Sequence, residues 1–229
     1  MRNRLTNCLA AALLGAGSGV LAAPSSLVAW DTETMNLLED ADAEAGRAKA
    51  EEINCARCHG DRGFSDKAGQ PSIAGQRMTY AYKQLRDYRD GTRENRRMAR
   101  YVEGLSDQDL ANLAAWYSGL PGPVLQATPA AATEVQELVS RGDGQRLIPA
   151  CAACHGTSGE GSRIGVPALA GQELDYLIET MYAYKDGERA NDVYGVMRYI
   201  SVALTDAEVE ALAEYYAALA VYPGADEAQ

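Results

Sequence analysis

Apolar residues recur at helical spacing in two segments of the chain, one in the middle and one close to the end. In residues 105–120, "LSDQDLANLAAWYSGL", Leu110, Leu113, Ala114 and Tyr117 fall on one face of a helix. Residues 204–218 repeat this spacing. Each segment opens with a hydroxyl residue followed three positions later by an acid, the pattern of a capping box. The two cap pairs are Ser106 with Asp109 and Thr205 with Glu208. The pattern predicts two amphipathic helices.

Shorter helical patterns lie at Ala43–Asn54 and Tyr80–Tyr88, and no segment shows the alternation or the turn signals of a β-hairpin. The predicted fold class is therefore all-α, with long loops between the helices. Hydrophobic residues make up 47% of the composition, which is enough for a packed core.

The second half of the chain repeats the first at an offset of 96 residues, which pairs Gly75 with Gly171 and Tyr80 with Tyr176. The offset then becomes 99, because three extra residues precede Met197 in the second copy. One long copy per half indicates two tandem domains of about 80 residues rather than a solenoid. Domains this small have thin cores and usually need a cofactor or another staple.

The repeat and the composition divide the chain into six parts. Between the two copies lies "LPGPVLQATPAAAT", a stretch with three prolines that is typical of a linker. The expected parts are a signal peptide at 1–22, an N-terminal extension at 23–42, domain 1 at 43–120, the linker at 121–133, domain 2 at 134–223 and a C-terminal tail at 224–229.

The first residues have the features of a secretory signal peptide. Arg2 and Arg4 precede the short apolar stretch Leu9–Val20, and Ala22 ends a small-residue cleavage site. This predicts export to the periplasm, as a soluble protein or one loosely associated with the membrane. The alternative, an uncleaved membrane anchor, is less well supported because the apolar stretch is short and rich in glycine.

The formal net charge of −11 argues against a general binder of nucleic acid or anionic membranes. Loss of Arg2 and Arg4 with the signal peptide would bring it to −13. The negative charge is uneven: residues 24–120 carry a net of −3 and residues 121–229 a net of −10.

Each half contains one Cys-x-x-Cys-His motif, and these motifs hold the only two histidines of the chain. The motif residues are Cys55, Cys58 and His59 in the first half and Cys151, Cys154 and His155 in the second. The pattern is that of a c-type haem attachment site, where the thiols form thioethers and the histidine binds the iron. We therefore expect two covalently bound haem c groups.

A redox disulfide and a zinc site would use some of the same residues, but both fit the motif less well. A thioredoxin-type disulfide uses Cys-x-x-Cys but requires a βαβ context, and the pattern here is helical. A structural zinc site needs four ligands, whereas each copy supplies three and the repeat implies that each copy works in its own domain.

The second axial ligand of each iron is expected to be a methionine, because no third histidine exists. Met98 and Met197 align with each other in the repeat, which makes them the candidates. The other methionines of the exported chain lack a matching methionine: Met78 aligns with Leu174, Met181 with Leu85, and Met35 has no counterpart. These behave as ordinary apolar positions.

Together these segments resemble the dihaem cytochrome c4 family over about residues 44–222. The resemblance rests on "CARCHG", "PSIAGQ" and "LSDQDLANLAAWYSGL" and on their counterparts "CAACHG", "PALAGQ" and "LTDAEVEALAEYY". It implies two tandem class I cytochrome c domains joined by the Pro-containing linker, each with His/Met iron. It also implies a periplasmic carrier of single electrons between a respiratory donor and a terminal oxidase or reductase.

By the same match, the carbonyls of Pro71 and Pro167 would accept a hydrogen bond from the second ring nitrogen of each histidine. Gln76, Gln172, Arg93 and Arg189 are candidate contacts for haem propionates. Six paired tyrosines are candidates either for such contacts or for ordinary packing: Tyr80, Tyr88, Tyr117, Tyr176, Tyr184 and Tyr216.

The sequence is compatible with three functions. The first is a shuttle between redox proteins, such as a respiratory complex and a terminal oxidase. The second is a dihaem enzyme, which is disfavoured because no spare histidine or cysteine remains to activate a substrate. The third is an electron-transfer subunit of a larger dehydrogenase, for example one that contains a flavin.

The segment Pro24–Ala41 has no counterpart in the second half and is either a docking arm or a disordered spacer. Oligomeric state is left open.

Arginines crowd around Met98 in the sequence: Arg86, Arg89, Arg93, Arg96, Arg97 and Arg100. This predicts a positive patch near the first haem that would attract an acidic partner.

Overall fold

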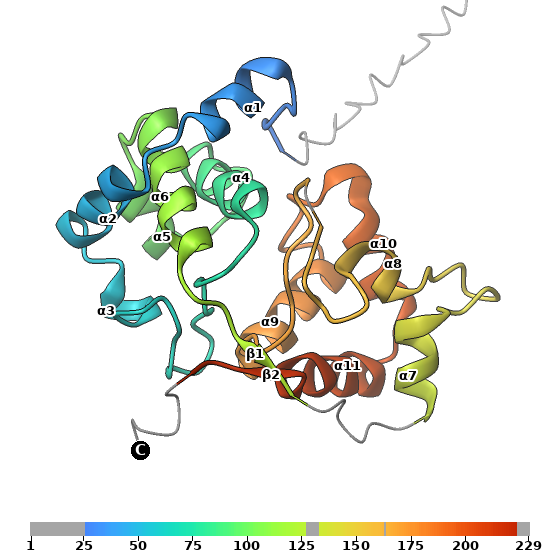
Figure 1. Cartoon of the computed structure of the whole chain (residues 1–229). Coiled ribbons are helices and arrows are strands. Elements are labelled where there is room, and N and C mark those ends of the chain that lie inside the picture. The colour runs from blue at the N-terminus through green and yellow to red at the C-terminus, as the bar shows by residue number, and fades with distance from the viewer. Residues whose placement is uncertain (1–25, 127–132, 163, 224–229) are drawn as a thin grey trace, which may run out of the picture.

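Two helical units lie side by side in the computed structural model, which describes residues 26–126, 133–162 and 164–223 (Figure 1). The predicted signal peptide, residues 127–132 of the predicted linker and the C-terminal tail fall outside the described residues. The all-α prediction is confirmed, and the two units correspond to the two copies of the repeat. Among the described residues, no helix has the length and apolar character needed to cross a membrane.

The first unit contains six described helices and the second contains five, with one short 3₁₀ turn. Those of the first unit are α1 (Thr32–Glu39), α2 (Ala43–Glu52), α3 (Ala56–His59), α4 (Met78–Arg89), α5 (Arg96–Val102) and α6 (Asp107–Gly119). Those of the second are α7 (Thr133–Ser140), α8 (Cys151–His155), α9 (Leu174–Lys185), η1 (Val193–Gly195), α10 (Val196–Ala203) and α11 (Asp206–Ala218).

The predicted amphipathic helices, α6 and α11, form the centre of each unit. Both capping boxes are present, with Ser106 and Thr205 as the N-cap residues. In the first unit, α2 approaches α6 so closely that a Cβ on Gly46 would lie 2.0 Å from the carbonyl oxygen of Asn112. Only glycine permits this close contact. The contact holds α2 against α6, so the Cys-x-x-Cys-His segment that follows α2 lies close to the core.

The described part of the N-terminal extension, from residue 26 onward, packs against the first unit. Leu38 of α1 is 6% exposed, and Trp30 and Leu37 pack on the same cluster of buried residues. The Ser26 hydroxyl donates to Asp87 Oδ1 at 2.7 Å. A Cβ on Gly165 of the second unit would lie 3.4 Å from Trp30 Cζ2, so the extension also reaches the second unit. In this structure, residues 26–41 are therefore an integral part of the fold rather than a spacer.

The predicted linker contains a strand that the sequence pattern did not indicate. Val124–Leu125 (β1) pairs antiparallel with Ala220–Val221 (β2), which follows the last helix (Figure 1). Two residues are too short for an alternating pattern, and the neighbouring prolines favoured a loop in the sequence. The pair anchors the start of the linker on the second unit.

We expect Leu38→Ala to lower the free energy of unfolding of the first domain by about 2–5 kcal/mol, because it leaves a cavity under α1. Guanidinium unfolding followed by absorbance and fluorescence measures this. Leu27 is the matched control, since its side chain is 51% exposed and its truncation should cost less than about 0.5 kcal/mol. Equal effects of the two substitutions would show that the extension does not contribute to the core.

Candidate haem sites and the domain interface

Each motif histidine is buried and held by one hydrogen bond to a proline carbonyl. His59 Nδ1 lies 2.9 Å from the Pro71 oxygen, and His155 Nδ1 lies 3.0 Å from the Pro167 oxygen. Because a carbonyl only accepts, Nδ1 carries the proton and the lone pair is on Nε2. Burial lowers the pKa of both imidazoles, which keeps them neutral. A neutral imidazole with a fixed tautomer is suited to bind a metal through Nε2.

A glycine ends each motif helix in a backbone conformation that other residues rarely adopt. Gly60 and Gly156 have φ values of 76° and 84°. A Cβ on Gly60 would lie 2.0 Å from the Phe64 carbonyl oxygen. The requirement at this position explains why both motifs read Cys-x-x-Cys-His-Gly, a signal that extends the haem motif by one residue.

The four motif cysteines are free thiols in the structure. Burial raises the pKa of the Cys55 and Cys151 thiols, so these stay protonated near neutral pH. No group of three or more His, Cys, Asp and Glu side chains among the described residues is arranged to hold a metal ion. The chemistry of the donor set, two unpaired thiols followed by one neutral imidazole, fits haem c.

Met98 lies in the first turns of α5, half-buried. The Asn95 side chain caps this helix by accepting from the backbone N–H of Arg97 and Met98 at 3.1 and 3.0 Å. An open cavity of about 510 Å³ has Cys58 of α3 on its wall together with Arg97 and Tyr101 of α5. The thiol and the helix that carries the candidate methionine therefore border one cavity.

The three extra residues of the second half reshape the segment before Met197. They form η1, in which Tyr194 and Gly195 have φ values of 58° and 69°. Gly195 now stands at the N-cap of α10, and Asp192 accepts from the Arg198 backbone and side chain at 3.0 and 2.7 Å. Met197 is half-buried at the start of α10. The insertion thus preserves a helix that begins just before the methionine but changes how it is capped.

The three methionines that have no matching methionine in the repeat lie outside α5 and α10. Met78 and Met181 pack against the apolar cores of the first and second unit, and Met35 is exposed on α1. Tyr117 and Tyr216 are also buried among core residues.

Gln76 and Gln172 connect the two domains in a symmetric way. The Gln76 amide donates to the Ala168 carbonyl at 3.0 Å and accepts from the Ala168 N–H at 2.8 Å. The Gln172 amide makes the same two bonds to Ser72, both at 2.8 Å. Ser72 and Ala168 are equivalent positions of the repeat, which indicates approximate twofold symmetry between the domains. These two positions follow Pro71 and Pro167, so the interface borders both histidine anchors.

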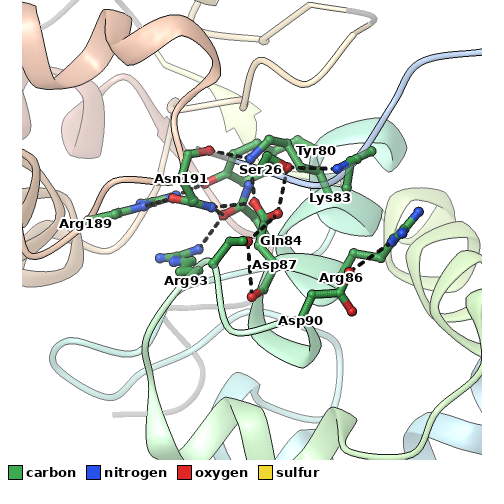
Figure 2. Close-up of polar contacts among 12 residues, drawn as sticks. Ser26, Tyr80, Lys83, Gln84, Arg86, Asp87, Asp90, Arg93, Arg189 and Asn191 are labelled. Carbon is green, nitrogen blue, oxygen red and sulfur yellow. Dashed lines mark hydrogen bonds and ion pairs between the residues drawn. The ribbon is translucent and has the colours of Figure 1, made fainter. Parts of the chain in front are cut away.

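Arg93 and Arg189 are buried in this interface, each over a tyrosine of its own domain and bonded to a tyrosine of the other. Arg93 Nη2 donates to Tyr176 Oη, and Arg189 Nη2 donates to Tyr80 Oη, both at 3.1 Å. The guanidinium carbons lie 4.6 and 4.5 Å from the ring centres of Tyr88 and Tyr184. The paired tyrosines of α4 and α9 therefore belong to the interface (Figure 2 labels Tyr80 with both arginines).

Three polar residues of α4 next to this symmetric set, Lys83, Gln84 and Asp87, are not matched in the repeat, and all three bond to Asn191 of the second domain. Gln84 Oε1 accepts from Arg93, Arg189 and Asn191 at 2.8–3.0 Å, and the Asn191 amide also donates to Asp87 Oδ2 at 2.7 Å (Figure 2). Lys83 donates to Asp87 and to the Asn191 carbonyl. The sequence positions that align with Lys83, Gln84 and Asp87 hold Glu, Thr and Ala. Sequence reasoning missed this cluster, and its one signal is that it breaks the repeat.

The interface holds more buried positive than negative charge. Lys83 pairs with Asp87, but in the described part of the chain neither Arg93 nor Arg189 has an ion pair with a carboxylate. Burial raises the pKa of the Tyr176 phenol, but the positive charges of Arg93 and Arg189 outweigh burial and bring that pKa down to about 7. A buried cation without a counter-charge is costly, so the site suits a bound anion.

Both halves of the chain match known protein families, and relatives cover most of its length. Residues 142–220 match the family described as cytochrome c, and residues 41–116 match the family described as cytochrome c oxidase, cbb3-type, subunit III. A cytochrome c4 of Thiocapsa roseopersicina is 36% identical over 76% of this chain and 91% of its own length. A thiosulfate dehydrogenase electron acceptor of Thiomonas intermedia is 38% identical over 80% of this chain and 86% of its own length.

Solved structures give the same result. Reduced cytochrome c4 from Pseudomonas stutzeri superposes with a TM-score of 0.72 at 35% identity, covering 78% of this chain and 99% of that one. The thiosulfate dehydrogenase (TsdBA) of Marichromatium purpuratum gives a TM-score of 0.66 at 32% identity, covering 76% of this chain and 39% of that one.

Two cytochrome c domains in tandem define a dihaem c-type cytochrome with two covalently bound haem c groups. The chain belongs to the cytochrome c4 family, and it carries electrons, as the cytochromes c4 do.

Proposed function

We propose that this cytochrome relays single electrons through two irons with the same His/Met ligation. In the first domain Cys55 and Cys58 hold the haem, and His59 and Met98 bind its iron. In the second domain the corresponding residues are Cys151, Cys154, His155 and Met197. When bound, each haem supplies a one-electron iron couple, and His/Met ligation is the pattern of electron-transfer cytochromes.

The observation that carries this proposal is the anchoring of both histidines. Each is buried, neutral and fixed through Nδ1 by a proline carbonyl, with Nε2 as its remaining ligand atom. Since both histidines are assigned as iron ligands, we propose no catalytic role for the chain itself. The N-terminal sequence supports export to the periplasm.

The haem propionates are proposed to enter the domain interface next to Arg93 and Arg189. The two guanidiniums are buried at 9% and 6% exposure without a described carboxylate partner, so two propionates would balance their charge. Gln76 and Gln172 already bind the backbone of the opposite domain through one amide hydrogen each. The second amide hydrogen of each is proposed to reach a propionate.

The electron donor is proposed to be a dehydrogenase of an oxidisable sulfur compound, and the acceptor a terminal oxidase or reductase. Relatives 38% and 39% identical to this chain are named thiosulfate dehydrogenase electron acceptors, which supports the donor class. These relatives support the role of a redox partner of the dehydrogenase. The alternative is that the chain stays bound to a dehydrogenase as a subunit.

Met98→Ala and Met197→Ala should each remove about half of the weak near-infrared absorption of the oxidised protein, which reports iron–sulfur coordination by methionine. Met35→Ala is the control, because Met35 is exposed on α1. If either ligand variant retained the full band, a different residue would be the ligand in that domain.

Arg189→Gln should lower the reduction potential of at least one haem. A positive charge near a haem disfavours the ferric state and raises the potential, so its removal lowers it. A unit charge at about 10 Å changes a one-electron potential by about 20–70 mV. Tyr80→Phe removes the hydrogen bond to Arg189 but no charge and should shift the potential less. A redox titration followed in the visible bands gives both values, and equal shifts would contradict the charge argument.

A thiosulfate dehydrogenase supplied with thiosulfate should reduce both haems of the purified cytochrome. The measurement is the rise of the reduced visible band in a stopped-flow spectrometer, with a mixture lacking thiosulfate as the control. If dithionite reduces the protein fully and the dehydrogenase does not, the donor belongs to another class. Co-purification of a flavin- or metal-containing subunit from the native periplasm would instead favour the bound-subunit alternative.

A further inference from the structure

The cavity beside Cys58 has a positively charged wall. Arg57, Lys67 and Arg97 line it, together with Ala68, Gln70 and Tyr101, and no carboxylate is among its lining residues. We call these three cations the basic rim. All three are exposed, and none forms an ion pair with a carboxylate within the described ranges. The Arg97 side chain makes a long contact to Gln70 Oε1, at 3.4 Å.

The basic rim differs from the arginine cluster that the sequence suggested. Arg86 and Arg89 contact Asp90 and Asp107, so their charges are largely balanced. Arg93 is buried in the domain interface. Arg57 and Lys67, which are distant from Met98 in the sequence, take their place beside Arg97. The positive surface is therefore assembled from three separate segments around the cavity.

The second domain carries apolar residues at the positions equivalent to Arg57 and Arg97. In the repeat, Arg57 corresponds to Ala153, Arg97 to Val196 and Arg100 to Tyr199. Val196 and Tyr199 are 45% and 51% exposed. Arg163, which aligns with Lys67, lies outside the described residues. The positions of Arg57, Arg97 and Arg100 thus carry charge in the first domain, and their counterparts in the second domain carry uncharged side chains.

We propose that an acidic redox protein docks on the basic rim and exchanges electrons with the haem of the first domain. The proposal rests on the haem positions in the proposed function, since Cys58 is both a predicted thioether and part of the cavity wall. The chain as a whole is strongly acidic, with a net charge of −11, and repels a partner of the same sign. A local positive rim on an acidic protein directs such a partner to one site and raises the rate of productive encounter.

The test compares two exposed arginines whose replacement by glutamate changes the charge equally. Arg57→Glu alters the basic rim, and Arg141→Glu alters the second domain after α7, where no ion pair of Arg141 is described. The oxidised variants are reduced by two reagents of opposite charge in a stopped-flow spectrometer. Flavodoxin hydroquinone is the acidic protein reductant, and hexaammineruthenium(II) is the cationic one.

With flavodoxin at low salt, Arg57→Glu should react about three- to tenfold more slowly than the unmodified protein, and Arg141→Glu should differ by less than about twofold. With the ruthenium complex, Arg57→Glu should react faster. Both effects should fade near 1 M salt, where the screening length is about 3 Å. Damage to the haem site would instead change both reactions in the same direction at every salt concentration.

Equal slowing by Arg57→Glu and Arg141→Glu would overturn the proposal, because it would reflect net charge rather than docking at the rim. Unchanged rates in Arg57→Glu would overturn it too. Haem content and the near-infrared band of each variant separate this result from a failure of the proposed function. If both are normal and the rates do not respond, the ligation stands and only the docking site is wrong.

Discussion

Two positive charges buried between the domains are the constraint on which the arrangement of this protein depends. A guanidinium removed from water must be surrounded by acceptors and balanced by an anion. Here part of the acceptors come from the opposite domain: Tyr176 for Arg93, and Tyr80 and Gln84 for Arg189. Neither domain could bury its arginine in the same way alone. Docking of the domains and the position of any propionate at the interface are therefore linked through the same two side chains.

The repeat explains why this arrangement is nearly symmetric, and it also made much of the fold predictable. The capping boxes of α6 and α11 and the all-α class follow from local patterns that survive without tertiary context. The histidine motifs were equally clear, because their spacing is set by the haem rather than by the fold. The structure adds the proline carbonyl that orients each imidazole, and these contacts have the partners that the family resemblance implies.

Other features depended on contacts between distant segments, and no local pattern indicated them. The N-terminal extension has no copy in the second half, so the repeat said nothing about α1, and only packing shows that Leu38 is buried. The two-residue strand β1 is defined by its partner β2 and by nothing in its own sequence. The arginine cluster looked like one surface patch in the sequence, yet Arg86 and Arg89 form ion pairs, Arg93 lies in the interface and Arg97 lies on the cavity wall. Charged residues that are close in sequence form one surface patch only where their side chains are exposed on the same surface.

The three-residue insertion before Met197 has a consequence for how domains can pair. Asn95 caps a helix in the first domain, whereas its counterpart Asn191 is released from that task and binds Gln84 and Asp87 across the interface. A pair of first domains would contain two sets of Gln84 and Asp87 with no Asn191 to bond to them. A pair of second domains would contain two Asn191 side chains without these partners. A small change in one copy of a duplicated domain thus makes unlike copies complementary, so that a first domain fits a second domain better than it fits another first domain.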